Sequence, residues 1–199
     1  MTKALREFAE AVLLALGIFF LLQLSIQNFR VEGASMQPTL EEGQYLLVNK
    51  LVYRQMDLAR LSRLVPFWEA EEPDSWFPFH PPRRGEVIVF HFPGDPRRDF
   101  VKRVIGLPGE HIRISRGKVY INGEVLEEPY LLSRSHENLR AITLSPDQYF
   151  VMGDNRTSSN DSRDWGPVPL ENVIGRAWIT YWPASRLGFF QLGLYPMAP

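Results

Sequence analysis

Residues His111 to Leu126 read HIRISRGKVYINGEVL, and this pattern indicates the fold class. Its apolar residues alternate with polar ones, as they do in strands that bury one face. The runs are separated by the dipeptides Arg116-Gly117 and Asn122-Gly123. Two-residue hairpin turns need positive φ angles, which glycine and asparagine adopt readily. The stretch therefore predicts two consecutive antiparallel hairpins.

The chain after residue 30 carries the same signature throughout. Short runs rich in β-branched and aromatic residues are bounded by proline and glycine, and no long helical period occurs among them. The predicted fold is mainly β, an antiparallel and β-barrel-like domain over residues 30–199, in which residues 110–144 form a small hairpin region. Besides the hairpins, we expect strands over residues 44–49, 86–92, 100–107, 149–152 and 176–182.

The amino-terminal part differs, because residues 11–29 (AVLLALGIFFLLQLSIQNF) carry no charge. A helix of this length reaches about 28 Å, close to the hydrocarbon core of a bilayer at about 30 Å. A cleaved signal peptide would show a small-x-small site after the run, and Val31-Glu32-Gly33 is a poor one. A buried core helix would be amphipathic, whereas Leu13–Leu22 is apolar on every face. We therefore expect a transmembrane anchor over residues 11–29, preceded by a short tail over residues 1–10.

Composition excludes several classes of function. The chain has 199 residues, 22 Lys+Arg against 23 Asp+Glu, and no cysteine. A net charge of -1 argues against nucleic acid as the main partner. The lack of cysteine excludes disulfides, thiolate nucleophiles and cysteine-based zinc sites. Lys3 and Arg6 precede the apolar run and only Arg30 follows it closely, which favours a cytoplasmic tail and an extracytoplasmic domain over residues 30–199.

Residues 54–83 form a predicted insertion loop that is rich in tryptophan, phenylalanine and proline. Its aromatic residues fit an aromatic lip that lies on the membrane interface. They also fit a long insertion whose aromatic side chains pack on the β-domain, and we favour this second interpretation.

Two residues are candidates for nucleophilic chemistry. Ser35 lies in a small-residue turn directly after the apolar run, within about 17 Å of Arg30 even in an extended chain. Lys102 shares a strand face with Phe100 and Val104, and burial there would disfavour its charge and lower its pKa. Lys50, at the end of a predicted strand, is its competitor. The four histidines are scattered, with no metal-ligand spacing.

A third segment, Gly153–Arg163 (GDNRTSSNDSR), follows a short apolar strand. It is either a solvated loop with local Asx turns or a buried polar network that positions a catalytic group. The sequons that begin at Asn155 and Asn160 are interpreted as accidental.

Taken together, these segments make the sequence resemble the type I signal peptidases. These are membrane-anchored Ser-Lys endopeptidases that remove signal peptides from exported proteins. One motif of this kind would be weak evidence, but five that occur in family order between residue 31 and about residue 182 are highly specific. They are Val31–Leu40 (VEGASMQPTL), Gly43–Lys50 (GQYLLVNK), Arg84–Phe90 (RGEVIVF), Val101–Gly109 (VKRVIGLPG) and Gly153–Arg163.

The resemblance implies that Ser35 is the nucleophile and Lys102 is its general base. It further implies that Ser159 hydrogen-bonds the lysine amine and orients it, and that Met36 lines the site. The supporting polar network would consist of Asp154, Arg156, Asp161 and Arg163.

The resemblance also sets expectations for partners and place. The enzyme would cut after a small-x-small site, in the plasma or inner membrane with its catalytic domain on the extracytoplasmic face. Its partners would be the signal peptides of exported preproteins and the lipid bilayer, with no nucleic acid. We expect a monomer, and no metal or organic cofactor is implied.

The chain departs from the family pattern in three places. Gly33 stands where some members carry a serine whose hydroxyl belongs to the oxyanion hole, so the oxyanion would rest on the Ser35 N–H and a further backbone donor. Gln44 stands where an aspartate is common, and Thr157-Ser158 replace a frequent Asp-Asn pair.

Two other classes of protein are alternatives to a signal peptidase. The self-cleaving Ser-Lys repressors share the dyad but lack a membrane helix and usually carry a DNA-binding domain. A membrane-tethered β-rich binding module, or an inactive homologue, would show no turnover.

Overall fold

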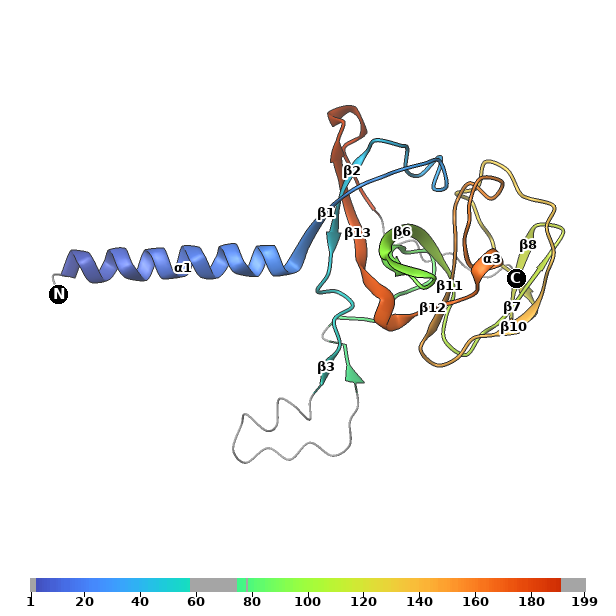
Figure 1. Cartoon of the computed structure of the whole chain (residues 1–199), viewed down its shortest axis with the longest axis horizontal. Coiled ribbons are helices and arrows are strands. Elements are labelled where there is room, and N and C mark those ends of the chain that lie inside the picture. The colour runs from blue at the N-terminus through green and yellow to red at the C-terminus, as the bar shows by residue number, and fades with distance from the viewer. Residues whose placement is uncertain (1–2, 58–74, 78, 191–199) are drawn as a thin grey trace.

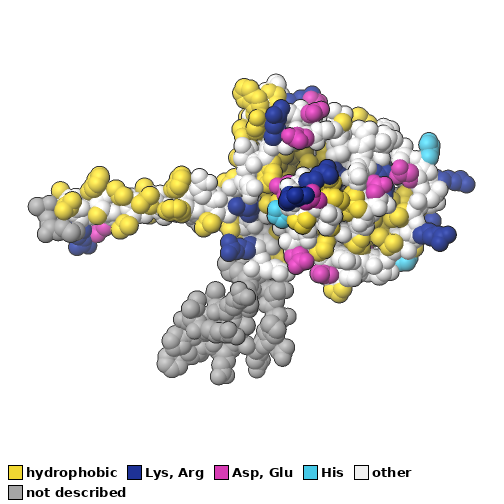
Figure 2. Space-filling view, viewed as in Figure 1, with side chains coloured by type: hydrophobic (Ala, Val, Ile, Leu, Met, Phe, Trp, Pro, Cys, Tyr) yellow, Lys and Arg dark blue, Asp and Glu magenta, His cyan; other side chains and the backbone are white. Residues whose placement is uncertain are grey.

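A computed structural model describes residues 3–57, 75–77 and 79–190 of the chain. One long helix, α1 (Lys3–Ser25), stands apart from the β-strands (Figure 1). Apolar side chains are exposed along its length (Figure 2). By length and composition α1 is able to cross a membrane. An exposed apolar surface of this kind needs a partner of matching polarity, and a hydrocarbon layer is one.

The helix expected over residues 11–29 has different bounds in the structure. α1 ends at Ser25, and β1 (Ile26–Arg30) follows it with no residue between them. β1 pairs along its full length with β2 (Tyr45–Asn49). The hydrogen bonds between the two strands satisfy backbone groups that a longer helix would have satisfied internally. The predicted end of the helix was therefore placed too far along the chain.

The main body is an eight-stranded antiparallel sheet. Its strand order is β1-β2-β13-β5-β6-β11-β12, with β14 paired to β13. β1 and β12 lie at opposite ends of this order, so the described strands form an open sheet and not a closed barrel. The remaining strands are β5 (Val87–Phe92), β6 (Asp95–Gly106), β11 (Gln148–Met152), β12 (Val168–Pro169), β13 (Val173–Trp182) and β14 (Gly188–Phe189).

Both faces of this sheet are covered, as the side chains of β5 show. Val87 and Val89 belong to one buried apolar cluster, together with residues of the turn after β1. Ile88 and Phe90 belong to another, together with residues of β11 and β12. Successive side chains of a strand point to opposite faces, so the two clusters lie on opposite sides of the sheet. This double burial explains why residues 87–90 are continuously apolar.

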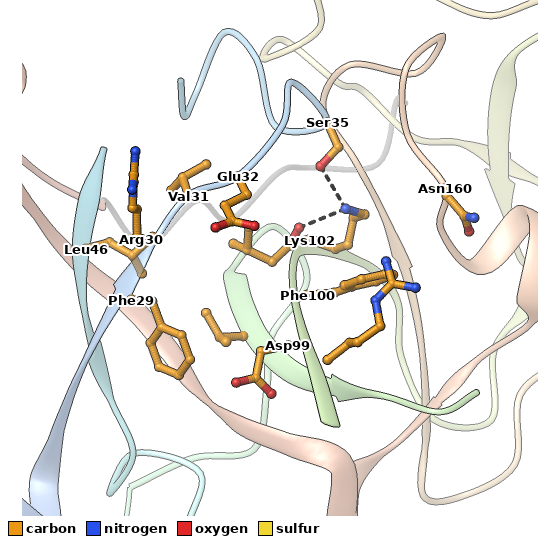
Figure 3. Close-up of a pocket in the computed structure, with 13 residues that line it drawn as sticks. Phe29, Arg30, Val31, Glu32, Ser35, Leu46, Asp99, Phe100, Lys102 and Asn160 are labelled. Carbon is orange, nitrogen blue, oxygen red and sulfur yellow. Dashed lines mark hydrogen bonds between the residues drawn. The ribbon is translucent and has the colours of Figure 1, made fainter. Parts of the chain in front are cut away.

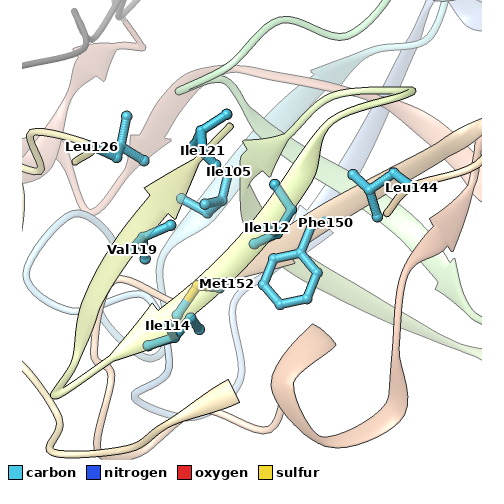
Figure 4. Packing of buried hydrophobic residues seen from close by; sticks show 9 residues of the cluster. All are labelled: Ile105, Ile112, Ile114, Val119, Ile121, Leu126, Leu144, Phe150 and Met152. Carbon is cyan, nitrogen blue, oxygen red and sulfur yellow. The ribbon is translucent and has the colours of Figure 1, made fainter. Parts of the chain in front are cut away.

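Residues 111–143 form a second sheet of four strands in the order β10-β7-β8-β9. Its two tight turns have positive φ angles at both residues, from Arg116 (48°) to Gly123 (95°), as the hairpin prediction requires. Buried side chains of this sheet pack on Ile105, Phe150 and Met152 of the main sheet (Figure 4). The strands are β7 (His111–Ser115), β8 (Lys118–Ile121), β9 (Glu124–Val125) and β10 (Leu139–Thr143).

The short elements complete the fold. β3 (Met56–Asp57) pairs with β4 (Ser75–Trp76) at the base of the segment expected to be an insertion loop. Most of that segment, residues 58–74 and 78, lies outside the described residues. Among its described aromatic residues, Phe79 is 66% exposed. A short helix, α3, and two 3-10 turns follow β11: α3 (Ser162–Trp165), η1 (Leu170–Asn172) and η2 (Ala184–Arg186).

Candidate active site

Ser35 and Lys102 are in direct contact although they are 67 residues apart in the chain. Lys102 Nζ donates a hydrogen bond to Ser35 Oγ at 2.8 Å and another to the Val101 carbonyl oxygen at 3.1 Å (Figure 3). Ser35 lies in the turn between β1 and β2, and Lys102 lies in β6. A hydroxyl and an amine at this distance can exchange a proton directly.

Burial sets the protonation state of Lys102. The residue is only 4% exposed, and desolvation lowers the pKa of its amine from 10.5 to about 8. The carboxylates of Asp161 and Asp154 act in the opposite direction and raise this pKa, while Arg163 lowers it further. The Phe100 ring lies below the amine, with its centroid 5.4 Å from Nζ. Lys102 is thus largely uncharged at a moderately alkaline pH, and a neutral amine can accept a proton.

Lys50, the competing lysine, lies elsewhere. It directly follows β2, and its backbone N–H donates to the carbonyl oxygen of Ser25 at 2.8 Å. It is not one of the residues that line the cavity beside Ser35. Within the part of the chain that the structure describes, Lys102 is the lysine that contacts Ser35.

A cavity of about 460 Å³ opens beside the Ser35–Lys102 pair. Residues of both β1 and β6 line the cavity, although these strands are not neighbours in the strand order of the main sheet. Apolar and polar side chains are mixed around it: Arg30 and Glu32 lie beside Val31 and Leu46, and Asn160 lies on the side of Phe100 (Figure 3). The apolar lining comes from Phe29, Val31, Leu46, Val89, Phe100 and Val101.

The turn that carries Ser35 is fixed from below by buried apolar residues. Met36 and Leu40 are 1% and 0% exposed and belong to the same cluster as Val31. Met36 therefore packs into the core, and it is absent from the lining of the cavity, which the resemblance had led us to expect it to join. Its contribution is to hold the turn in place.

Asp154 ties the same turn to the strand of the lysine. Arg103, the neighbour of Lys102, donates from Nε and Nη2 to the two Asp154 carboxylate oxygens at 2.8 and 2.6 Å. Thr39, in the Ser35 turn, donates its hydroxyl to the same carboxylate. Both charged side chains are buried, at 6% and 0% exposure. One buried ion pair thus connects the segments that carry the serine and the lysine.

The other predicted network residues form two further ion pairs. Asp161 accepts from Arg163 Nε at 2.8 Å and from the Gly153 backbone N–H at 2.9 Å, and it caps the first turn of α3. Arg156 donates to the buried carboxylate of Glu128, and its Nε donates to the Gly153 carbonyl oxygen at 3.1 Å. All of these side chains position the segment after β11, and within the described residues none hydrogen-bonds Ser35 or Lys102.

Ser159 is placed differently from the expectation. Its Oγ is buried and has no hydrogen-bond partner among the described residues, so the expected bond to the Lys102 amine is not formed here. The hydroxyl nevertheless lies beside Gly153, which in turn lies against the Ser35 carbonyl oxygen. Gly33 is exposed with a φ of 77°, and an added Cβ would meet nothing within 4 Å.

Three residues of the site escaped the sequence analysis: Arg103, Glu128 and Asn155. Arg103 stands next to Lys102 in a motif that was singled out, and its charge in a buried strand was an available signal. Glu128 lies in an unremarkable polar stretch after β9, and nothing in its surroundings indicates a partner at residue 156. Asn155 donates from its backbone N–H to the Ser35 carbonyl oxygen at 3.0 Å and from Nδ2 to the Ala34 carbonyl oxygen at 3.2 Å.

Comparison with known proteins confirms the resemblance. Residues 5–182 match the family described as signal peptidase, peptidase S26. The probable signal peptidase I-1 of Synechocystis sp. is 37% identical over 203 residues, which cover 98% of this chain and 90% of that protein. The signal peptidase I of Leptolyngbya laminosa is 38% identical over 194 residues, 91% of this chain and 82% of that protein.

A crystal structure of a signal peptidase I from Enterococcus faecalis is also similar, with 32% sequence identity and a TM-score of 0.45. The match covers 49% of this chain and 97% of that one. Since the family match extends over most of the sequence, the chain belongs to the signal peptidase family, peptidase S26.

Proposed function

We propose that this chain is a membrane-bound serine endopeptidase that cleaves amino-terminal signal peptides from exported preproteins after a small-x-small site. The observation that carries the proposal is the 2.8 Å contact between Ser35 Oγ and an amine, that of Lys102, whose pKa burial lowers to about 8. Membership of the signal peptidase family supplies the substrate class.

The proposed reaction follows from that contact. Neutral Lys102 takes the proton from Ser35 Oγ as the oxygen attacks the carbonyl carbon of the scissile bond. Collapse of the tetrahedral intermediate breaks the C–N bond, and Lys102 returns the proton to the leaving amine. Water then repeats the cycle: Lys102 takes one proton from the water, the hydroxide attacks the acyl-enzyme, and Lys102 returns that proton to Ser35 Oγ as the acyl–oxygen bond breaks. The signal peptide leaves as a carboxylic acid, which loses its own proton to the solvent.

The negative charge of the intermediate needs hydrogen-bond donors. Gly33 offers no side-chain hydroxyl, so backbone N–H groups must stabilise the negative charge. The Ser35 N–H is available, because it donates to no group within the described residues. We assign it as one oxyanion donor.

Ser159 keeps its proposed role as the residue that orients Lys102. A buried hydroxyl without a partner costs free energy and is uncommon. Hydrogen bonds of active sites are often long or absent before substrate binds and form in the substrate complex. We propose that the hydroxyl bonds the Lys102 amine at that stage.

The cavity suits an extended peptide with small side chains. Its apolar lining next to Ser35 favours small apolar groups, and the resemblance places the first and third residues before the cut in such pockets. β1 offers the strand edge opposite to β2, along which a peptide can add as a further strand.

The proposed location follows from α1. We propose that it anchors the chain in the plasma or inner membrane, with the short tail in the cytoplasm and the β-domain outside, and that the chain acts as a monomer on preproteins in the bilayer. Ser35 lies ten residues after the end of α1, so the chain cannot carry it more than about 36 Å from that end of the helix. A signal peptide leaves its own apolar segment in the membrane with the cleavage site a short distance beyond.

Cleavage of a purified preprotein by the full-length enzyme in detergent tests the proposal. We expect one cut after a small-x-small site, activity that rises with pH through about 8, and no turnover by Ser35→Ala or Lys102→Ala. Lys50→Ala is the matched control, because this lysine does not line the cavity, and it should retain activity. Normal activity in Lys102→Ala would overturn the base assignment. Absence of turnover by the wild type across several preproteins would favour a tethered binding module instead.

A further inference from the structure

The Ser35 turn is held by a residue outside the expected network, and its contacts suggest a role in catalysis. Asn155, which follows Asp154 in the loop after β11, bonds the carbonyl oxygens on both sides of the Ser35 Cα. Its backbone N–H donates to Ser35 O at 3.0 Å, and its side-chain Nδ2 donates to Ala34 O at 3.2 Å. These bonds act on the two peptide units that flank the nucleophile.

The side-chain bond acts on the peptide unit that carries the proposed oxyanion donor. Ala34 C=O and Ser35 N–H belong to one planar unit, in which a trans peptide bond points the oxygen and the hydrogen in opposite directions. A group that fixes the Ala34 oxygen therefore fixes the direction of the Ser35 N–H. A hydrogen bond at the oxygen also polarises the unit and strengthens its N–H as a donor.

Asn155 is itself held firmly enough to do this. Its Oδ1 accepts from the Thr157 hydroxyl at 3.1 Å, and its carbonyl oxygen accepts from the Ser158 N–H at 3.1 Å. The residue before it, Asp154, is 1% exposed and ion-paired with Arg103. Ala34 O also accepts from the Gln37 N–H at 3.2 Å.

We propose that Asn155 is a positioning residue that aims and polarises the Ser35 N–H toward the oxyanion of the tetrahedral intermediate. This inference rests on the proposed function, since it assigns Asn155 a part in the same acyl transfer. Loss of the Nδ2 donor leaves the Ser35–Lys102 contact intact and weakens only the stabilisation of the intermediate. The effect belongs to the transition state and not to substrate binding.

The test compares wild type, Asn155→Ala and Asn155→Leu, the second of which preserves volume without a donor. Removal of a whole oxyanion donor costs about 10²–10³-fold in kcat, so loss of its orientation should cost about 10–100-fold. KM should not change, and the pH profile should keep its midpoint at about 8, because Lys102 remains buried. A peptide aldehyde, whose adduct with Ser35 carries the oxyanion, should lose affinity by the same factor as kcat/KM, while the cleaved product peptide should bind as before.

Asn172→Ala is the matched control. Asn172 Nδ2 also donates to a backbone carbonyl oxygen, that of His91 at 3.0 Å, but it lies away from Ser35. It should leave kcat and aldehyde affinity unchanged. Wild-type kcat in both Asn155 variants would overturn this inference but not the proposed function. A loss of activity accompanied by an upward shift of the pH midpoint would also overturn it, because the effect would then act through Lys102. A wild type that does not cleave, or a Ser35→Ala variant that does, would overturn the proposed function and the inference with it.

Discussion

Gly153 leaves no room for a side chain beside Ser35. A Cβ on Gly153 would overlap the Ser35 carbonyl oxygen and the Ser159 hydroxyl, and would lie 2.6 Å from Ser159 Cβ. Three segments therefore pack against one another at Gly153, which has no side chain. They are the turn that carries Ser35, the end of β11 and the loop that carries Ser159.

Gly153→Ala should disturb all three segments. Because the clash involves a backbone oxygen, we expect the free energy of unfolding to fall by about 1–3 kcal/mol and kcat to fall strongly as Ser35 moves relative to Lys102. Thermal unfolding and preprotein cleavage measure the two effects. Gly188→Ala is the control, since an added Cβ there would meet only the Arg186 carbonyl oxygen at 3.9 Å. Wild-type kinetics in Gly153→Ala would show that the packing is looser than the structure indicates.

Lys102 should reduce stability at neutral pH. Its pKa in the folded protein, about 8, lies below its ordinary value of 10.5, so between these values the unfolded chain binds more protons and stability rises with pH. Below about pH 8 the full cost of burying the amine is present, and the difference between the two pKa values corresponds to about 3 kcal/mol.

The substitution Lys102→Met should therefore abolish activity and yet raise the free energy of unfolding at pH 7. The gain should shrink as the pH rises from about 8 and should vanish above 10.5, where the wild-type amine is mainly neutral in both the folded and the unfolded state. Denaturant unfolding of the full-length protein in micelles at pH 7 and pH 10 checks this, with Lys50→Met as the control. If Lys102→Met changed the free energy of unfolding equally at both pH values, burial would not determine the pKa of this amine.

Ser159→Ala should separate stability from activity. The buried Ser159 hydroxyl has no partner among the described residues, so its removal should leave the free energy of unfolding unchanged or raise it by about 1 kcal/mol. If the hydroxyl orients Lys102 in the substrate complex, kcat should fall by about 10-fold or more. The exposed neighbour Ser158 provides the control variant, Ser158→Ala. An unchanged kcat would remove Ser159 from the catalytic machinery.

Glu128→Ala should be strongly destabilising. Glu128 and Arg156 are each 1% exposed, and the substitution would leave the guanidinium buried without its counter-charge. We expect a loss of about 3–5 kcal/mol, measured by denaturant unfolding. Glu127→Ala, at an exposed neighbour, should have little effect. The double variant Glu128→Leu with Arg156→Met should recover much of the loss, and a double variant as unstable as Glu128→Ala would contradict this account.

Local sequence patterns predicted the elements whose cause is local. The turns at residues 116–117 and 122–123 were predictable because their φ angles demand particular residues. Lys102 was identifiable because a lysine flanked by apolar strand residues is rare, and its burial is confirmed. The capping box of α3, between Asp161 and Asp164, was an available local signal that the sequence analysis missed.

Other features depend on partners that are far away in the chain. α1 gives way to β1 because β2 supplies the pairing strand, and the sequence of residues 26–30 alone does not contain that information. Asn155 bonds Ala34 across 121 residues, and Arg103 pairs with Asp154 across 51. Such contacts appear only when the sheet has brought β6, β11 and the Ser35 turn together.

The direct passage from α1 into β1 has a consequence for affinity. No linker separates the two elements. If α1 is the membrane anchor, as we propose, this direct connection holds the sheet and its cavity at a defined place relative to the membrane. Under the proposed function, the enzyme and its preprotein are confined to the same bilayer and meet by lateral diffusion. Confinement of this kind raises the effective concentration of one partner for the other. A cavity that contacts only a few small side chains can then be sufficient, so one enzyme can serve many preproteins whose sequences differ everywhere except beside the cut.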